Sequence, residues 1–308
     1  MSLTKIKCGS LFSRCLLVCL LPGALSPAAF AEETKAPFPI GSKFSRTVQT
    51  VTGLNLVAGF VASRAAQSAL RKKTGGKVKV HVKTYSLTDL MAGKVKSFDA
   101  QVEEPKFEGV PLSSVKVSSS GPIWYQYKKT KETKRGMQTP VTLAVHAEVN
   151  QSDIEEALNS PKVIGSLRGL KLNLPGLDEE QLQVLSPKVA IKDETINLAA
   201  TLVVKGQPPE TGVAVKISAR PTLVDGSKII FADLKVDGGG IVEPEKFAAF
   251  AETLLNPVVD FARMDRRDHA FRLSSLQLSG DSMVGDGNLL LAPQEKDKSQ
   301  LAGNNKKK

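Results

Sequence analysis

Apolar and polar residues alternate in short segments along most of the chain beyond residue 77. In residues 77–83 valine alternates with lysine and histidine, and residues 141–149 repeat this alternation. The pattern returns in residues 110–117, 195–204, 213–219, 230–236, 271–278 and 283–291. Successive side chains of a strand point to opposite faces of a sheet, so this period predicts antiparallel strands with one apolar and one wet face. We expect about ten to twelve such strands.

Two longer segments have helical spacing instead. Apolar residues recur every three or four positions from Phe44 through Val48, Val51 and Leu54 to Ala69, which predicts one apolar face on a helix over residues 44–72. A second helix is expected over residues 244–263, with a kink where Pro257 removes a hydrogen bond. A capping box at residues 152–155 predicts a short helix to about residue 158.

The predicted fold class is therefore α+β, built on one long antiparallel sheet. A sheet of this length with one apolar face must either close into a sandwich or curl strongly around a helix. Curling around the long N-terminal helix and the kinked C-terminal helix leaves an elongated apolar groove. With 41% hydrophobic and 24% charged residues among 308, the chain can bury a substantial core.

The first 31 residues have the layout of a secretory signal peptide. Lys5, Lys7 and Arg14 precede an apolar run that is too short to span a bilayer, and a small-residue cleavage site ends at Ala31. An uncleaved membrane anchor is the alternative. We expect residues 32–43 to be a linker, residues 44–292 one folded domain, and residues 293–308 a disordered polar tail. The protein is then exported, and periplasmic or otherwise extracytoplasmic.

Catalytic and metal-binding constellations are not evident in the sequence. The cysteines at positions 8, 15 and 19 leave with the signal peptide, so the mature chain has no thiol nucleophile or ligand. His81, His146 and His269 lie far apart, and the Gly-Asp-Ser at residues 280–282 lacks a downstream histidine. We expect no enzyme activity, no cofactor and no metal. An enzyme acting on lipid or glycan would require scattered carboxylates to converge in space.

A basic segment directly follows an aromatic one. Interfacial aromatic rings beside cations favour docking on an anionic membrane surface, whereas a solvated hairpin tip is the plainer interpretation. The predicted membrane-docking residues are Trp124, Tyr125, Tyr127, Lys128, Lys129, Lys131, Lys134 and Arg135. No nucleic-acid partner is expected, because the lysine-bearing face of residues 77–83 has no aromatic residue for stacking.

Four segments together resemble the LmeA-like phospholipid-binding family. They are LTDLMAGKVKSFDA at 87–100, FEGVPLSSVKV at 107–117, SDIE at 152–155 and LLNPVVDF at 254–261. The resemblance implies an extracytoplasmic, non-enzymatic protein that binds phospholipid, with a fold akin to the tubular lipid-binding proteins. It transfers no catalytic residue. The basic loop at 128–135 and the polar tail depart from the family pattern.

The leading hypothesis is a lipid-binding or lipid-carrying protein of the cell envelope, peripheral to the membrane. The predicted lipid-groove residues are Phe44, Val48, Val51, Leu54, Phe247, Phe250, Leu254 and Phe261. The same residues could instead close a dry core. A structural or scaffolding envelope protein, which binds anionic polymer or a protein partner through its basic surface, is the alternative function.

Overall fold

The computed structural model describes most of the chain beyond residue 35. The described residues are 36–42, 47, 49, 54–107, 110–127, 135–161, 164, 170–171, 181–239 and 243–293. The chain divides into two compact units, residues 1–36 and 37–308, and every element discussed below belongs to the second unit.

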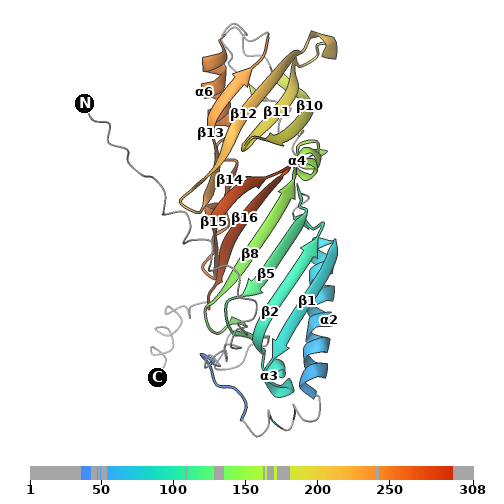
Figure 1. Cartoon of the computed structure of the whole chain (residues 1–308), viewed down its shortest axis with the longest axis vertical. Coiled ribbons are helices and arrows are strands. Elements are labelled where there is room, and N and C mark those ends of the chain that lie inside the picture. The colour runs from blue at the N-terminus through green and yellow to red at the C-terminus, as the bar shows by residue number, and fades with distance from the viewer. Residues whose placement is uncertain are drawn as a thin grey trace, which may run out of the picture. The chain divides into compact units, whose positions relative to one another are not determined.

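Two antiparallel sheets form most of this unit (Figure 1). The eight-stranded sheet has the order β15-β16-β8-β5-β2-β6-β7, and β1 pairs with β2. Its strands are β1 (Lys77–Thr84), β2 (Lys94–Glu103), β5 (Ser114–Ser119), β6 (Ile123–Gln126), β7 (Gly136–Met137), β8 (Val141–Asn150), β15 (His269–Ser279) and β16 (Ser282–Leu291). The last hairpin, β15-β16, pairs with β8 rather than with the strands that precede it in the chain.

The six-stranded sheet is formed by the part of the chain between β8 and β15. Its order is β14-β13-β12-β11-β10-β9. Its strands are β9 (Leu170–Lys171), β10 (Gln181–Lys192), β11 (Thr195–Val204), β12 (Val213–Val224), β13 (Lys228–Asp237) and β14 (Val259–Asp260). A two-stranded ribbon of β3 (Lys106–Phe107) and β4 (Val110–Pro111) completes the strands.

The described helices are few and short compared with the sheets. They are α2 (Leu54–Thr74), α3 (Leu87–Met91), α4 (Gln151–Leu158) and α6 (Pro244–Leu255), with 3-10 turns η1 (Pro209–Thr211) and η2 (Phe261–Met264). The expected curled antiparallel sheet is confirmed, but the fold is mainly β rather than α+β. The prediction of a single long sheet is also wrong, since most strands divide between an eight-stranded and a six-stranded sheet.

Helix α2 packs along β1 at the edge of the eight-stranded sheet, and the prediction that the sheet wraps this helix is only partly confirmed. Ser63 Oγ accepts a hydrogen bond from Val82 N (3.0 Å), and Gln67 Nε2 donates one to Val78 O (2.6 Å). Both bonds satisfy backbone groups on the outer edge of β1, which has a strand partner only on its other side. The helix is therefore attached by polar side chains and close contact, and Gly59 allows its backbone to approach Val82 O.

The face of α2 that the sequence marks as apolar is open to solvent. Val57, Val61, Ala65 and Ala69 are exposed, whereas Ala58 is buried. The expectation that this face packs into the core is wrong over the described part of the helix. The physical reason is that docking on a strand edge requires small residues and hydrogen-bonding groups, which lie on the neighbouring face.

Helix α6 ends earlier than the sequence predicts. The residue before a proline favours extended backbone, and Asn256 is extended with φ −101° and ψ 136°. Its side chain accepts a hydrogen bond from Phe231 N (2.7 Å) and donates one to Phe231 O (2.9 Å), which fixes the chain against β13. The chain then continues as β14 at the sheet edge. The prediction of a kinked helix that reaches residue 263 is therefore wrong.

Two clusters of buried hydrophobic side chains lie on the six-stranded sheet, and further buried residues such as Val78, Val102 and Leu143 lie on the eight-stranded sheet. The first contains Val189, Ile191, Ile196, Ala219 and Phe231, and side chains of α4, α6, β15 and β16 pack around it. The second contains Val215, Phe247 and Ala251, so it joins α6 to the sheet. Helix α4 is present as predicted, but its capping box uses Asn150 and Asp153 rather than residues 152 and 155.

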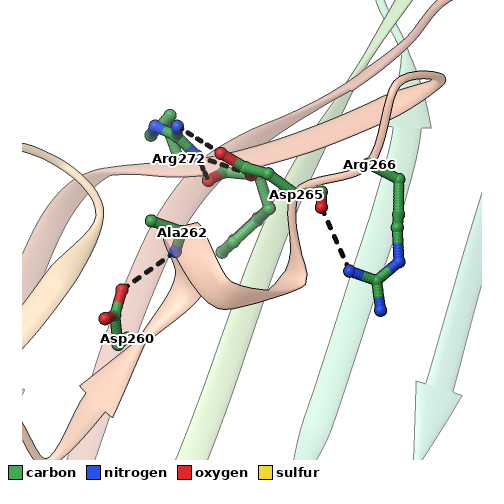
Figure 2. A network of polar contacts seen from close by, with 6 residues as sticks. Asp260, Ala262, Asp265, Arg266 and Arg272 are labelled. Carbon is green, nitrogen blue, oxygen red and sulfur yellow. Dashed lines mark hydrogen bonds and ion pairs between the residues drawn. The ribbon is translucent and has the colours of Figure 1, made fainter.

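Polar contacts attach the segment after β14 to strand β15 (Figure 2). Arg272 donates hydrogen bonds to both carboxylate oxygens of Asp265, with distances of 2.9 and 2.6 Å. Asp260 Oδ1 accepts from Ala262 N (3.1 Å), and Arg266 Nη1 donates to Asp265 O (3.3 Å). This network holds η2 where the chain leaves the six-stranded sheet and enters the eight-stranded one.

We expect the Asp265 to Arg272 pair to make stability depend on acid pH. The hydrogen bond from Arg272 is the main cause that lowers the pKa of Asp265 below its ordinary 3.8, and the Arg272 charge acts in the same direction against desolvation. A folded pKa below the unfolded value stabilises the fold above about pH 3.8, and this contribution is lost as the pH falls through the folded pKa.

Asp265→Asn should therefore lower the free energy of unfolding near neutral pH and have no effect once wild-type Asp265 is protonated. Urea unfolding across this pH range measures the difference. In the Arg272→Gln variant, NMR titration should place the Asp265 pKa close to its ordinary value. A wild-type Asp265 that already titrates at the ordinary value would contradict the prediction.

Candidate functional site

Large apolar side chains are exposed on neighbouring elements at one end of the eight-stranded sheet. Val57, Phe60 and Val61 of α2 are 59%, 62% and 57% exposed, Met91 at the end of α3 is 79% exposed, and Tyr127 after β6 is 58% exposed. The connections place them together: α2 contacts α3, α3 contacts β2, and Gly93 at the start of β2 lies against Tyr125 and Tyr127. We call these five residues the apolar end.

Cationic side chains surround the apolar end. Lys83 and Lys96 are exposed and have no ion pair within the part of the chain that the structure describes. The Arg64 guanidinium lies 5.2 Å from the centre of the Phe60 ring, and Lys94 Nζ lies 4.8 Å from that of Trp124. Exposed rings and aliphatic side chains beside unpaired cations are typical of a surface that meets lipid headgroups.

The predicted docking residues that the structure describes lie on or beside the β6-β7 hairpin and divide into two kinds. Strand β6 pairs with β2 and with β7. Trp124 packs within the protein, with its ring 5.6 Å from that of Phe38. Tyr125 contacts Tyr127, with ring centres 5.3 Å apart, and Tyr127 and Arg135 are exposed. Lys128, Lys129, Lys131 and Lys134 lie outside the described residues.

The segment before α2 is attached to this same end, although the sequence predicts a linker over residues 32–43. Phe38 is 6% exposed and packs against Tyr85 and Trp124. Gly41 N donates to Asp89 Oδ1 (2.9 Å), and Ser86 Oγ donates to Asp89 Oδ2 (2.6 Å). Sequence reasoning missed this anchor. An isolated phenylalanine between two prolines was the only available signal.

The predicted lipid-groove residues are distributed over different parts of the fold. Phe44, Val48 and Val51, and the side chains of Leu54 and Leu254, lie outside the described residues. Phe247 and Phe250 both belong to α6, where Phe247 is buried and Phe250 is half-buried, with their ring centres 6.3 Å apart. Phe261 packs against Phe271 of β15, with ring centres 5.0 Å apart.

One groove enclosed by both helices is not confirmed. Helix α2 packs on β1 of the eight-stranded sheet, whereas α6 packs on β13 of the six-stranded sheet. Contact of the predicted residues with lipid remains a prediction. The apolar surface under α6 is nevertheless incompletely closed, since Leu202, Ile217, Leu234 and Val236 around Phe247 are only partly buried.

The polar face of the eight-stranded sheet forms an open groove with a cavity volume of about 690 Å³. Adjacent strands place Lys79, Gln101, Lys116, His146 and Asp286 in one row across the sheet. His146 Nδ1 lies 2.7 Å from Asp286 Oδ1. That hydrogen bond, followed by one from Ser275, lowers the pKa of Asp286. No described residues form a group of three or more potential metal ligands.

A second groove, of about 710 Å³, separates α2 from the polar side of β1. Its lining includes Phe60, Arg64, Lys79, His81, Lys83 and Lys96. It shares Lys79, Val80 and His81 with the first groove, so the two are neighbours. Both volumes lie within the range of small-molecule sites.

The described fold and surfaces define a sheet-built binding protein whose exposed features suit an amphiphilic, anionic ligand. None of the described helices has the length and hydropathy needed to cross a membrane. A sequence model of the LmeA-like phospholipid-binding family matches residues 52–288, and the chain belongs to this family. No curated protein and no solved structure matches the chain.

Proposed function

We propose that this protein is an exported, extracytoplasmic carrier of phospholipid that works at the surface of an anionic membrane in the cell envelope. Membership of the LmeA-like phospholipid-binding family supports the phospholipid part of this proposal. The observation that carries the membrane part is the apolar end, where side chains of α2, α3 and the β6-β7 hairpin are 57% to 79% exposed beside unpaired cations. The chain acts as a binding protein without catalysis, and it is peripheral to the membrane.

The acyl chains in this proposal lie against the incompletely covered apolar surface around α6. Phe250 is half-buried, Val213 is 37% exposed, and the neighbouring apolar residues of β11, β12 and β13 are partly buried. These groups offer an apolar contact surface that α6 does not fill. Mass spectrometry of lipid extracted from the purified protein tests this directly: near-stoichiometric phospholipid is expected, and a protein that neither carries nor takes up lipid would refute the carrier.

The alternative is an envelope scaffold that holds anionic polymer or a protein partner through its basic surface. The unpaired cations favour it, but it gives no role to the exposed apolar side chains. A scaffold of this kind would bind polymer in a salt-sensitive way and would not distinguish lipids by their acyl chains.

We expect Val61→Ser with Met91→Ser to weaken vesicle binding about thirtyfold, since each apolar side chain that enters the interface contributes on the order of 1 kcal/mol. Sedimentation with vesicles of phosphatidylcholine and phosphatidylglycerol in equal amounts measures the loss. Both side chains are exposed (57% and 79%), so the fold should be retained.

The matched control is Val258→Ser with Met264→Ser. It removes the same two side-chain types from exposed positions outside the apolar end (42% and 47%). The control should bind vesicles like the wild type. Equal weakening in the two double variants would show that general surface hydrophobicity, and not the apolar end, drives binding.

A further inference from the structure

We infer that the groove between α2 and β1 binds the phosphate group of a ligand, and that in the proposed carrier this is the phosphate of the lipid headgroup. The inference rests on the proposed function for the source of the phosphate. The anion site itself is argued from the groove alone.

The groove is a consequence of how α2 is attached. Hydrogen bonds from Val82 N to Ser63 Oγ (3.0 Å) and from Gln67 Nε2 to Val78 O (2.6 Å) hold the helix on the strand edge. The helix is thereby fixed beside the polar side of β1, and a space of about 710 Å³ remains between Phe60 and Arg64 of the helix and the lysines of the strand. Lys96 of β2 extends the lining.

The charged side chains among the described lining residues are all positive. They are Arg64, Lys79, Lys83 and Lys96, and none of the described lining residues is an aspartate or glutamate. Of these lining cations, Lys79 is the only one with an ion pair to another described residue, Glu103, at 3.3 Å. Arg64, Lys83 and Lys96 therefore line the groove and form no ion pair with another described residue. A guanidinium fork with two ammonium groups matches the oxygens of a phosphate better than it matches a single carboxylate.

The strand edge supplies a backbone donor at the same place. The N–H and C=O of one residue in a strand point the same way, and successive residues alternate. Because Val78 O and Val82 N point toward α2, the N–H of Val80 points out of the same edge, between the two attachments. Val80 lines the groove, and its N–H has no hydrogen-bond partner in the described part of the chain. It can donate to a phosphate oxygen.

The groove also borders the apolar end, which explains why an amphiphile fits it. Phe60 belongs to both, with its ring 62% exposed and the Arg64 guanidinium stacked on it. A lipid at the membrane surface meets Phe60 with its glycerol portion, and meets Arg64, Lys83 and Lys96 with its phosphate. Inorganic phosphate and glycerol phosphate present the same anion without the apolar part.

The test compares four probes with the purified protein: inorganic phosphate, glycerol 3-phosphate, dihexanoyl phosphatidic acid and dihexanoylglycerol. Wild-type protein should bind phosphatidic acid more tightly than either soluble phosphate, with a shift of the Val80 amide resonance in NMR spectra. Lys83→Gln with Lys96→Gln should weaken phosphatidic acid binding about tenfold, since charged hydrogen bonds are lost. Binding of dihexanoylglycerol, which has no phosphate, should stay unchanged.

Lys188→Gln with Lys192→Gln is the charge-matched control on the exposed surface of the six-stranded sheet. It should bind all four probes like the wild type. Equal weakening by both double variants would overturn the site, because net charge alone would then explain binding. Weaker dihexanoylglycerol binding in the Lys83 and Lys96 variant would also overturn it. The site would also be overturned if no phosphate compound shifted the Val80 amide resonance of the wild-type protein.

The source of the phosphate is decided separately. If inorganic phosphate binds as tightly as phosphatidic acid, the assignment to a lipid headgroup is overturned. If the wild type binds neither lipid while soluble phosphate still shifts Val80 through Lys83 and Lys96, the proposed lipid carrier fails and the anion site is retained.

Discussion

Replacing Gly93 with alanine should destabilise the fold by at least about 3 kcal/mol, since it adds a steric overlap to a strained backbone conformation. Gly93 has φ +76°, which disfavours residues with a side chain. A Cβ atom there would overlap the carbonyl oxygen of Tyr125 and approach the Tyr127 ring. The carbonyl oxygen of Gly93 also accepts a hydrogen bond from Tyr125 N (2.9 Å), so strand β6 would have to move away from Gly93.

Gly280→Ala separates the two contributions. Gly280 has a similar φ of +61°, but no atom lies within 4 Å of the position that a Cβ would take. It should therefore cost only the conformational strain, about 1 kcal/mol. Urea denaturation of both variants gives the comparison. Equal losses would show that the close approach of Gly93 to Tyr125 does not constrain the hairpin.

The expected effect on function follows from the position of this contact. Strand β6 carries the hairpin that ends in Tyr127, and Gly93 lies between α3 and β2, next to Met91. Displacing the hairpin would separate Tyr127 from the other residues of the apolar end. Gly93→Ala should thus weaken vesicle binding even at temperatures where it stays folded, whereas Gly280→Ala should not.

The sequence predicted strands well because the alternation of side chains reports directly on the two faces of a sheet. Residues 141–149 were expected as a strand and form β8, Val141–Asn150, with Val141 and Leu143 buried. Alternation says nothing about which strand is the neighbour. It could not reveal that β15-β16 pair with β8, or that the intervening strands form a second sheet.

The face of α2 shows a different limit of sequence reasoning. Periodic spacing identified a helix and an apolar face correctly, but the inference that an apolar face is a buried face failed. Polar Ser63 and Gln67 make the attachment, and no helical pattern distinguishes such residues from solvent-exposed ones. Val57 and Val61, which lie on the predicted apolar face, were consequently expected to be buried, whereas both are exposed. The second groove was missed for the same reason, since it requires knowing which strand edge the helix covers.

The hairpin that carries the predicted docking residues was found from sequence because its signal is local. Aromatic residues directly before a basic run lie on one hairpin whatever the surrounding topology, and β6-β7 is that hairpin. Trp124 nevertheless packs on Phe38, a contact over 86 residues of chain that no local pattern could predict. The pairing within this hairpin was thus predictable from neighbours in sequence, whereas its contact with the distant Phe38 was not.

Phe247→Ala should lower the free energy of unfolding by about 3 kcal/mol, in the range measured for buried phenylalanine. Phe247 is 7% exposed and lies in the cluster with Val215 and Ala251 that fixes α6 to the sheet. Truncation leaves a cavity beneath the helix. Loss of lipid uptake in this variant would accompany loss of stability and could not by itself distinguish a core from a lipid-binding surface.

Phe250→Ala makes that distinction, because the same side chain is removed three residues along the same helix. Phe250 is only half-buried, so its truncation should cost about 1 kcal/mol or less in stability. If acyl chains contact the open part of the α6 surface, uptake of labelled phospholipid should fall severalfold in a protein that remains folded. If Phe250→Ala takes up lipid like the wild type, the acyl chains do not contact this surface, and the exposed face of α2 becomes the place to look for them.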